Sequence, residues 1–319
     1  MSGPGKRNRG ALTDPAVLKS SRRGSAPETV SARWIAAGFA AAVVAAALCV
    51  WGALCFLFWQ GSWQLLYHPK ATIAQTPANA GLVFDSIGFA TTEAGQPQLH
   101  GWWIPGPPMS RFTAIYLHGA NGNIGDTIPA LGPLYSAKLN LLIFDYRGYG
   151  MSRFVRPSEA HWREDVELAI HYLTDTRHLP AGSIVLVGSG LGANLALEVA
   201  AAHPDLAGVV LEDPAVSPED AVFNDPRARL VPAHWLVRDR WDLRAAAGAL
   251  HVPSLWLETP APVAHENQPN NSAYDAVAAR KVRVWRPDAA TRAAETSKAV
   301  SRWLGDLGSR SHESDSKNE

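Results

Sequence analysis

One apolar segment separates this chain into parts with very different solubility. Residues 34–59 read WIAAGFAAAVVAAALCVWGALCFLFW and contain no charged side chain. A helix of this length exceeds the roughly 20 residues needed to span a bilayer. Trp34, Trp59 and Trp63 stand at its ends, where interfacial aromatic residues anchor membrane helices. We therefore expect one transmembrane helix over residues 34–59 and a membrane as a partner.

The flank before this segment predicts its orientation. Residues 1–33 are rich in Ser, Gly, Pro and Arg, with seven Lys/Arg against Asp14 and Glu28, a composition typical of disorder. The positive-inside rule keeps this basic flank in the cytoplasm and the following domain on the extracytoplasmic side, in a bacterium the periplasm. A cleaved signal peptide is the alternative. Signal peptides have a shorter apolar region followed by a small-residue cleavage site, whereas the run at 34–59 is longer and no such site follows it.

Strand-like and helical patterns alternate after residue 60. Strands are expected at 82–91, 99–106, 113–119, 139–148, 183–188, 206–213, 253–259 and 281–287, and helices at 128–138, 158–176, 192–203 and 288–306. This alternation favours an α/β class, with a mostly parallel sheet and helices on both faces. Residues 60–308 form the expected domain, residues 214–252 a small cap within it, and residues 309–319 a polar tail. Residues 68–82 read as a linker or an extended lead-in.

Composition and motifs exclude several function classes. The chain has 29 basic and 29 acidic residues, so its net charge gives no reason to expect nucleic acid. Its two cysteines, Cys49 and Cys55, lie in the apolar segment, which leaves no cysteine nucleophile elsewhere. GANGNIG lacks the Gly-Lys-Ser/Thr ending of a phosphate loop, and the frame Gly188, Gly190, Ala193 matches a dinucleotide fingerprint only in part. No cofactor is expected.

One expected helix carries three side chains of types that bind metals. His161, Glu164 and Asp165 could share a helical face. Since no further ligand is visible, we interpret them as a solvated face and expect no metal.

Three motifs in order carry a family resemblance. They are LHGANGNIGD (117–126), FDYRGYGMS (144–152) with RPSEAHWREDVELAIHYL (156–173), and LVGSGLGANLALEVA (186–200). Together they resemble the membrane-anchored α/β-hydrolase-domain proteins of the serine hydrolase superfamily, over roughly residues 63–308. The resemblance implies an α/β-hydrolase fold and a serine, a histidine and an acid that cleave esters or amides.

The nucleophile position of that triad holds glycine. The elbow frame G-x-S-x-G aligns with Gly188, Gly190 and Gly192, which places Gly190 where the resemblance implies serine. Ser189 lies one position early, so its side chain should leave the turn in another direction.

The acid and histidine positions also depart from the family pattern. The stretch LWLETPAPVAHENQPNN (255–271) contains no aspartate, and no histidine follows the last expected strand within residues 281–304. Glu258 at a strand end reads as a solvated edge charge. Asp213, after the sixth strand of the domain, and His265, in the following loop, are the remaining substitutes.

The oxyanion site depends on backbone groups, which these substitutions leave in place. The N–H groups of Ala120, after Gly119, and of Leu191, after Gly190, should still point at a carbonyl or carboxylate oxygen. We therefore expect a non-catalytic protein that binds an acyl or carbonyl ligand, or a protein partner, at the former active site. The alternatives are an esterase- or thioesterase-like serine hydrolase using Ser189 with His265 and Asp213, and a membrane scaffold.

Overall fold

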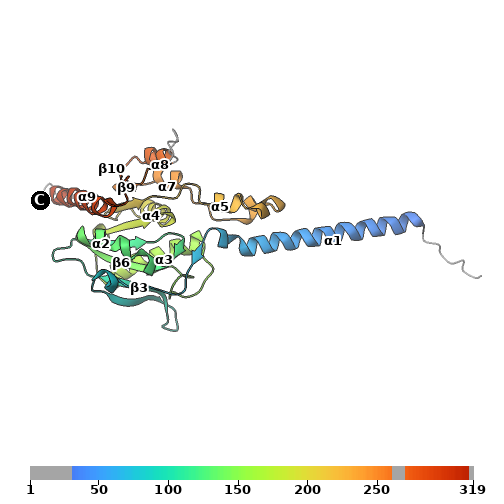
Figure 1. Cartoon of the computed structure of the whole chain (residues 1–319), viewed down its shortest axis with the longest axis horizontal. Coiled ribbons are helices and arrows are strands. Elements are labelled where there is room, and N and C mark those ends of the chain that lie inside the picture. Colours follow the sequence, from blue (N-terminus) through green and yellow to red (C-terminus); the bar gives the residue numbers. More distant parts are fainter. Residues whose placement is uncertain (1–30, 261–269, 316–319) are drawn as a thin grey trace, which may run out of the picture. The chain divides into compact units, whose positions relative to one another are not determined.

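The computed structural model describes residues 31–260 and 270–315 of the 319-residue chain. The chain divides into two compact units, residues 1–52 and 53–319. The helix α1, Ala32–Gly61, begins in the first unit and ends in the second (Figure 1). It is long and apolar enough to cross a membrane, as expected for residues 34–59.

The second unit is built on one sheet. Within the described residues it has eight strands in the order β10-β9-β8-β7-β4-β6-β3-β2. Only β3 runs opposite to the other strands, because it is antiparallel to both β2 and β6, so the predicted mostly parallel sheet is confirmed. The strand bounds are β2 Asp85–Thr91, β3 Pro97–Ile104, β4 Phe112–Leu117, β6 Leu139–Asp145, β7 Ile184–Ser189, β8 Gly208–Glu212, β9 Ser254–Glu258 and β10 Lys281–Trp285.

Helices cover both faces of this sheet. On one face α2 (Ile128–Ser136) and α9 (Arg292–Asp315) pack with Leu131 and Trp303 over the valines of β7. On the other face lie α3 (Glu159–His171) and α4 (Leu191–Ala202). The helices α7 (Leu243–Gly248) and α8 (Asn270–Ala276) add to this second layer (Figure 1). The parallel strands β4, β6, β7, β8 and β9 are buried on both faces, which explains their continuous apolar runs.

Short elements complete the second unit. The segment between β8 and β9, where the sequence predicts a small cap, consists of short helices. The remaining elements are the helices α5 Asp220–Phe223 and α6 Ala233–Leu236, the 3-10 turns η1 Ser62–Leu65, η2 Pro77–Ala80, η3 Ile124–Thr127, η5 Ala181–Ser183 and η6 Pro226–Leu230, and the π-helical turn η4 Tyr172–Thr176.

Two segments at the ends of the domain have secondary structure that the sequence did not predict. The expected linker contains β1 (His68–Pro69), which pairs with β5 (Asn121–Gly122), because its backbone partners lie some 50 residues away and leave no local pattern. The helix α9 runs to Asp315, into the expected polar tail, because no proline or glycine stops it after Gly308.

Candidate functional site

Gly190 forms the apex of a sharp turn between β7 and α4. Its backbone angles are φ 57° and ψ −123°, a conformation that costs little only for glycine. The strand ends at Ser189 and the helix begins at Leu191, as the elbow frame predicts.

The two outer glycines permit close backbone packing around this apex. A Cβ atom on Gly188 would lie 2.1 Å from the carbonyl oxygen of Gly192, and one on Gly192 would lie 2.2 Å from the carbonyl oxygen of Leu117. A Cβ on Gly190 would meet no heavy atom within 4 Å. The outer positions therefore require glycine for space, whereas the apex has room for a side chain.

The loop after β4 lies against this elbow. An added Cβ on Gly119 would be 3.4 Å from the carbonyl oxygen of Ser189. The carbonyl oxygen of Ala120 accepts hydrogen bonds from the Tyr149 hydroxyl at 2.8 Å and from the His68 N–H at 2.9 Å. Among the described residues, no acceptor is bonded to the N–H group of Ala120 or Leu191. The oxyanion role of these two N–H groups stays a prediction.

Ser189 lies one position before the apex, on the side of β7 that faces α2 and α9. It alternates with Val185 and Val187 along β7, whose side chains pack on the α2 and α9 face. Burial raises the pKa of the nearby Tyr116 hydroxyl well above its usual value, and Ser189 opposes that rise. Within residues 31–260 and 270–315, no histidine is bonded to Ser189, and His265 itself lies outside the described residues.

Asp213 is committed to other partners. It accepts hydrogen bonds from the Thr259 N–H at 2.6 Å and from the Thr259 hydroxyl at 3.0 Å, and it pairs with Arg286 at 3.2 Å. The Arg286 guanidinium also pairs with Glu212 and donates to the Thr296 hydroxyl at 2.8 Å. These bonds hold the carboxylate in a structural cluster at the carboxyl edge of the sheet.

Arg286 is the residue of this cluster that sequence reasoning missed. It directly follows β10 and its side chain is fully buried. In the sequence it stands inside the expected strand 281–287, which also contains Lys281 and Arg283, so its charge alone does not set it apart. Its partners lie 73 and 74 positions away, so nothing local announces the pairing.

The interpretation of Glu258 as a solvated edge charge was wrong. The residue is buried at the end of β9 and its carboxylate lies 3.2 Å from the Arg283 Nε atom. Burial raises the pKa of this carboxyl, and the nearby Arg283 guanidinium opposes that rise. The charge faces inward because β9 is covered on both sides.

The expected solvated face on α3 was also wrong for Asp165. This residue is fully buried and accepts hydrogen bonds from the backbone N–H and the side chain of Arg147. Glu164 pairs with the same guanidinium at 2.7 Å, and His161 donates to the Arg156 carbonyl oxygen at 2.9 Å. These contacts tie α3 to the loop after β6. The described part of the chain holds no group of three potential metal ligands.

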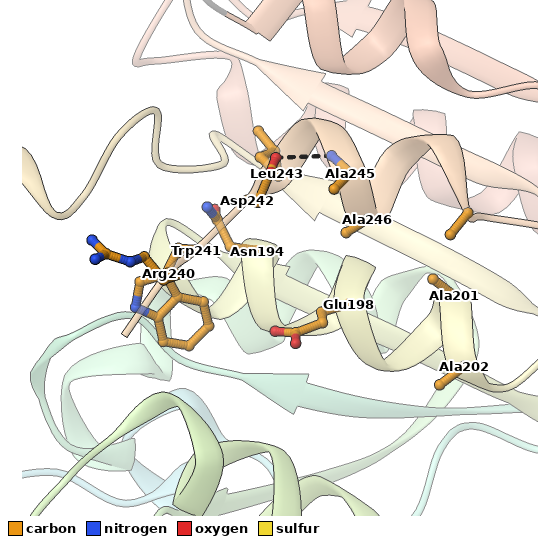
Figure 2. Close-up of a pocket in the computed structure, with 11 residues that line it drawn as sticks. Asn194, Glu198, Ala201, Ala202, Arg240, Trp241, Asp242, Leu243, Ala245 and Ala246 are labelled. Carbon is orange, nitrogen blue, oxygen red and sulfur yellow. Dashed lines mark hydrogen bonds between the residues drawn. The ribbon is translucent and has the colours of Figure 1, made fainter. Parts of the chain in front are cut away.

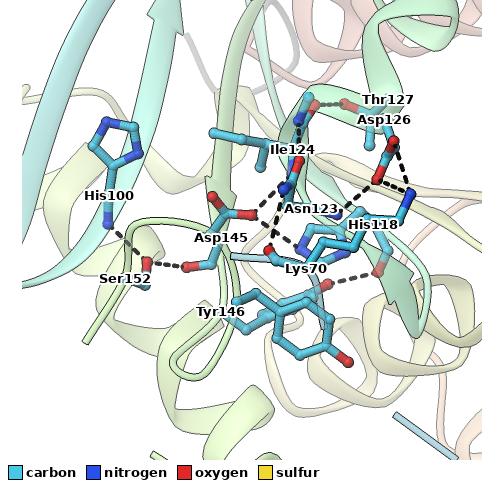
Figure 3. A network of polar contacts seen from close by, with 12 residues as sticks. Lys70, His100, His118, Asn123, Ile124, Asp126, Thr127, Asp145, Tyr146 and Ser152 are labelled. Atoms are coloured by element: carbon cyan, nitrogen blue, oxygen red, sulfur yellow. Dashed lines mark hydrogen bonds and ion pairs between the residues drawn. The ribbon is translucent and has the colours of Figure 1, made fainter. Parts of the chain in front are cut away.

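A buried histidine–aspartate pair lies beside the loop after β4 (Figure 3). The His118 Nε2 atom is 3.8 Å from an Asp145 carboxylate oxygen, and that oxygen accepts a hydrogen bond from the Ile124 N–H at 2.9 Å. Desolvation lowers the pKa of His118 to about 4 and raises the pKa of Asp145 to about 7. The rings of Tyr146 and Tyr149 pack against His118, so the pair supports the loop from inside.

Two cavities flank the elbow without including it. One, of about 390 Å³, lies between α4 and residues 240–249 and is lined by Asn194, Glu198 and Trp241 (Figure 2). The other, of about 280 Å³, lies at the carboxyl edge of the sheet and is lined mainly by apolar side chains with Tyr116 and Arg292.

Comparisons with known proteins agree with this architecture. Residues 110–249 match the family described as "Serine aminopeptidase, S33". The chain is 28% identical over 239 residues to the uncharacterized protein YfhR of Salmonella typhi, covering 70% of this chain and 78% of that protein. It is 34% identical over 117 residues to protein bem46 of Schizosaccharomyces pombe, covering 36% and 39%.

A solved structure shares the fold. The Pyrococcus furiosus esterase Pf2001 superposes with a TM-score of 0.57 at 19% identity, covering 77% of this chain and 98% of the esterase.

Proposed function

Because this chain is a member of the α/β-hydrolase superfamily with glycine at the nucleophile position, we propose that it binds an acyl or carboxylate ligand at its elbow without cleaving it. One observation carries the proposal. Gly190 forms the apex of the elbow beside the N–H donors of Ala120 and Leu191, while Asp213 is held by Thr259 and Arg286. A site of this kind retains recognition of an oxyanion and lacks the base that would activate a hydroxyl.

Leu191 offers a direct test, because it is the first residue of α4. Proline is well tolerated at this helical position and has no N–H group. Leu191→Pro should therefore remove one oxyanion donor, whereas Leu191→Ala shortens the same buried side chain and keeps the donor. We expect octanoate, measured by isothermal titration calorimetry, to bind Leu191→Pro roughly tenfold more weakly than Leu191→Ala, from the strength of a hydrogen bond to a charged group.

A fluorophosphonate probe, which labels activated serines, supplies the second measurement. We expect no labelling of the full chain. Equal octanoate affinity in the two Leu191 variants would refute the binding site. Labelling that Ser189→Ala abolishes would instead establish the serine hydrolase alternative.

We also propose that residues 34–59 cross a membrane once, with residues 1–33 in the cytoplasm. The length and apolar character of α1 support the crossing, and the basic flank supports the orientation. Protease added to bacterial spheroplasts that express the chain should digest the second unit and spare residues 1–33. Protection of the second unit would reverse the orientation.

A further inference from the structure

The end of α1 is built into the second unit. The helix has 30 residues, about 45 Å at 1.5 Å per residue, while the hydrocarbon core of a bilayer is about 30 Å thick. The second unit begins at Ala53, and Phe58 is buried in its core. If Trp34 enters the hydrocarbon at one side, the helix leaves it near Ala53. The last turns of α1 then lie at the level of the lipid headgroups.

A cavity opens beside these last turns. It has a volume of about 370 Å³ and brings together the end of α1, the loop before α3 and the segment after α6. Its lining combines aromatic and basic side chains, among them Trp59, Trp63, Arg156, His161 and Arg238. Indole and guanidinium groups together suit the interface between water and the headgroups.

The cavity carries unpaired positive charge. Arg156 donates to the Trp59 carbonyl oxygen at 2.6 Å and lies over the indole ring of that residue. Arg238 has no hydrogen-bond or ion-pair partner anywhere in the described part of the chain. The acidic residue of the lining, Asp239, accepts a hydrogen bond from the Tyr67 hydroxyl at 2.6 Å. Two arginines and one aspartate therefore line the cavity.

Exposed apolar side chains stand on the same segments. Trp235 is 86% exposed and directly precedes Leu236, which lines the cavity. Phe154 is 77% exposed and lies two residues before Arg156. Aromatic side chains this exposed are costly in water and favourable among headgroups.

We propose that this cavity binds the phosphate headgroup of an anionic membrane phospholipid, with Arg156 and Arg238 on the phosphate and Trp235 and Phe154 inserted beside it. The inference rests on the proposed membrane anchor. It adds a lipid-binding surface on the second unit to the single membrane helix.

Native mass spectrometry of the full chain in a mild non-ionic detergent tests the site. The probes are dioctanoyl phosphatidylglycerol, dioctanoyl glycerol, which lacks the phosphate, and inorganic phosphate. We expect phosphatidylglycerol to bind most tightly. Arg238→Gln, at a side chain without a partner, should weaken that binding about fivefold, the value of one basic residue near an anionic surface. Arg156→Gln should weaken it at least as much.

A matched control is Arg302→Gln, which changes an exposed arginine on α9 far along the chain from the cavity. It should leave phosphatidylglycerol binding unchanged. Equal binding of dioctanoyl glycerol, unchanged binding by Arg238→Gln, or equal competition by inorganic phosphate would each overturn the proposal. Alkaline carbonate extraction of membranes reports on the anchor separately, because lipid binding in detergent does not depend on insertion.

Discussion

Restoring serine at the apex of the elbow should give a folded protein without esterase activity. Gly190 has a φ of 57°, which a serine must adopt in order to keep the turn. That strain costs on the order of 1–3 kcal/mol. No steric penalty adds to it, because a Cβ at this position meets no heavy atom within 4 Å.

The neighbouring glycine provides the matched comparison. In Gly188→Ala the new Cβ would lie 2.1 Å from the Gly192 carbonyl oxygen, a backbone atom that cannot move without displacing α4. We expect a loss above about 4 kcal/mol, the range of severe core disruption. Urea unfolding of the full chain in detergent measures both variants. Similar stability of Gly188→Ala and Gly190→Ser would refute the packing argument.

Activity is the second readout of Gly190→Ser. In the serine protease subtilisin, removal of the histidine alone costs about as much as removal of the whole triad. A restored hydroxyl without a base should therefore gain little. The rates at which wild type and Gly190→Ser hydrolyse p-nitrophenyl butyrate should both stay near the rate without protein. A rise of more than about a hundredfold, the lower end for one acid–base group, would mean that a histidine reaches the apex after all.

Two further predictions concern buried charges. Arg286→Met should lower the free energy of unfolding by about 3 kcal/mol, since it leaves the Glu212 and Asp213 carboxylates without their cation. Arg286→Lys keeps a positive charge and should lose less stability in the same urea assay. Equal losses in the two variants would contradict the charge argument. The pKa of Asp145 is raised to about 7, so the stability that its carboxyl contributes is present below pH 4 and is lost as the pH rises through 7. The pKa of His118 is lowered to about 4, so this residue makes the free energy of unfolding rise between pH 4 and 6.5. Asp145→Asn should remove the loss of stability due to Asp145 and leave only the rise due to His118. The free energy of unfolding should then increase by at most about 1.4 kcal/mol per pH unit over pH 4 to 6.5. If it depends on pH in the same way as in wild type, this account is refuted.

Local patterns in the sequence were enough to predict the architecture. The apolar run at residues 34–59, the alternation of strands and helices, and the glycine frame around Gly190 each reflect a short-range property. Helical periodicity, strand burial and backbone freedom at glycine act over a few residues, so they are readable without knowing what lies nearby in space. The confirmed sheet and the elbow conformation belong to this class.

The tertiary structure decided where the charged side chains of the site point. Asp213 read as a possible catalytic acid and Glu258 as a solvated charge, yet the first is bound by Thr259 and Arg286 and the second is buried beside Arg283. Whether a carboxylate can act as a catalytic acid or only as a structural ion-pair partner depends on the nearest cation and on its access to water. For Asp213 that cation stands 73 positions further along the chain, so only the folding of the sheet brings the pair together.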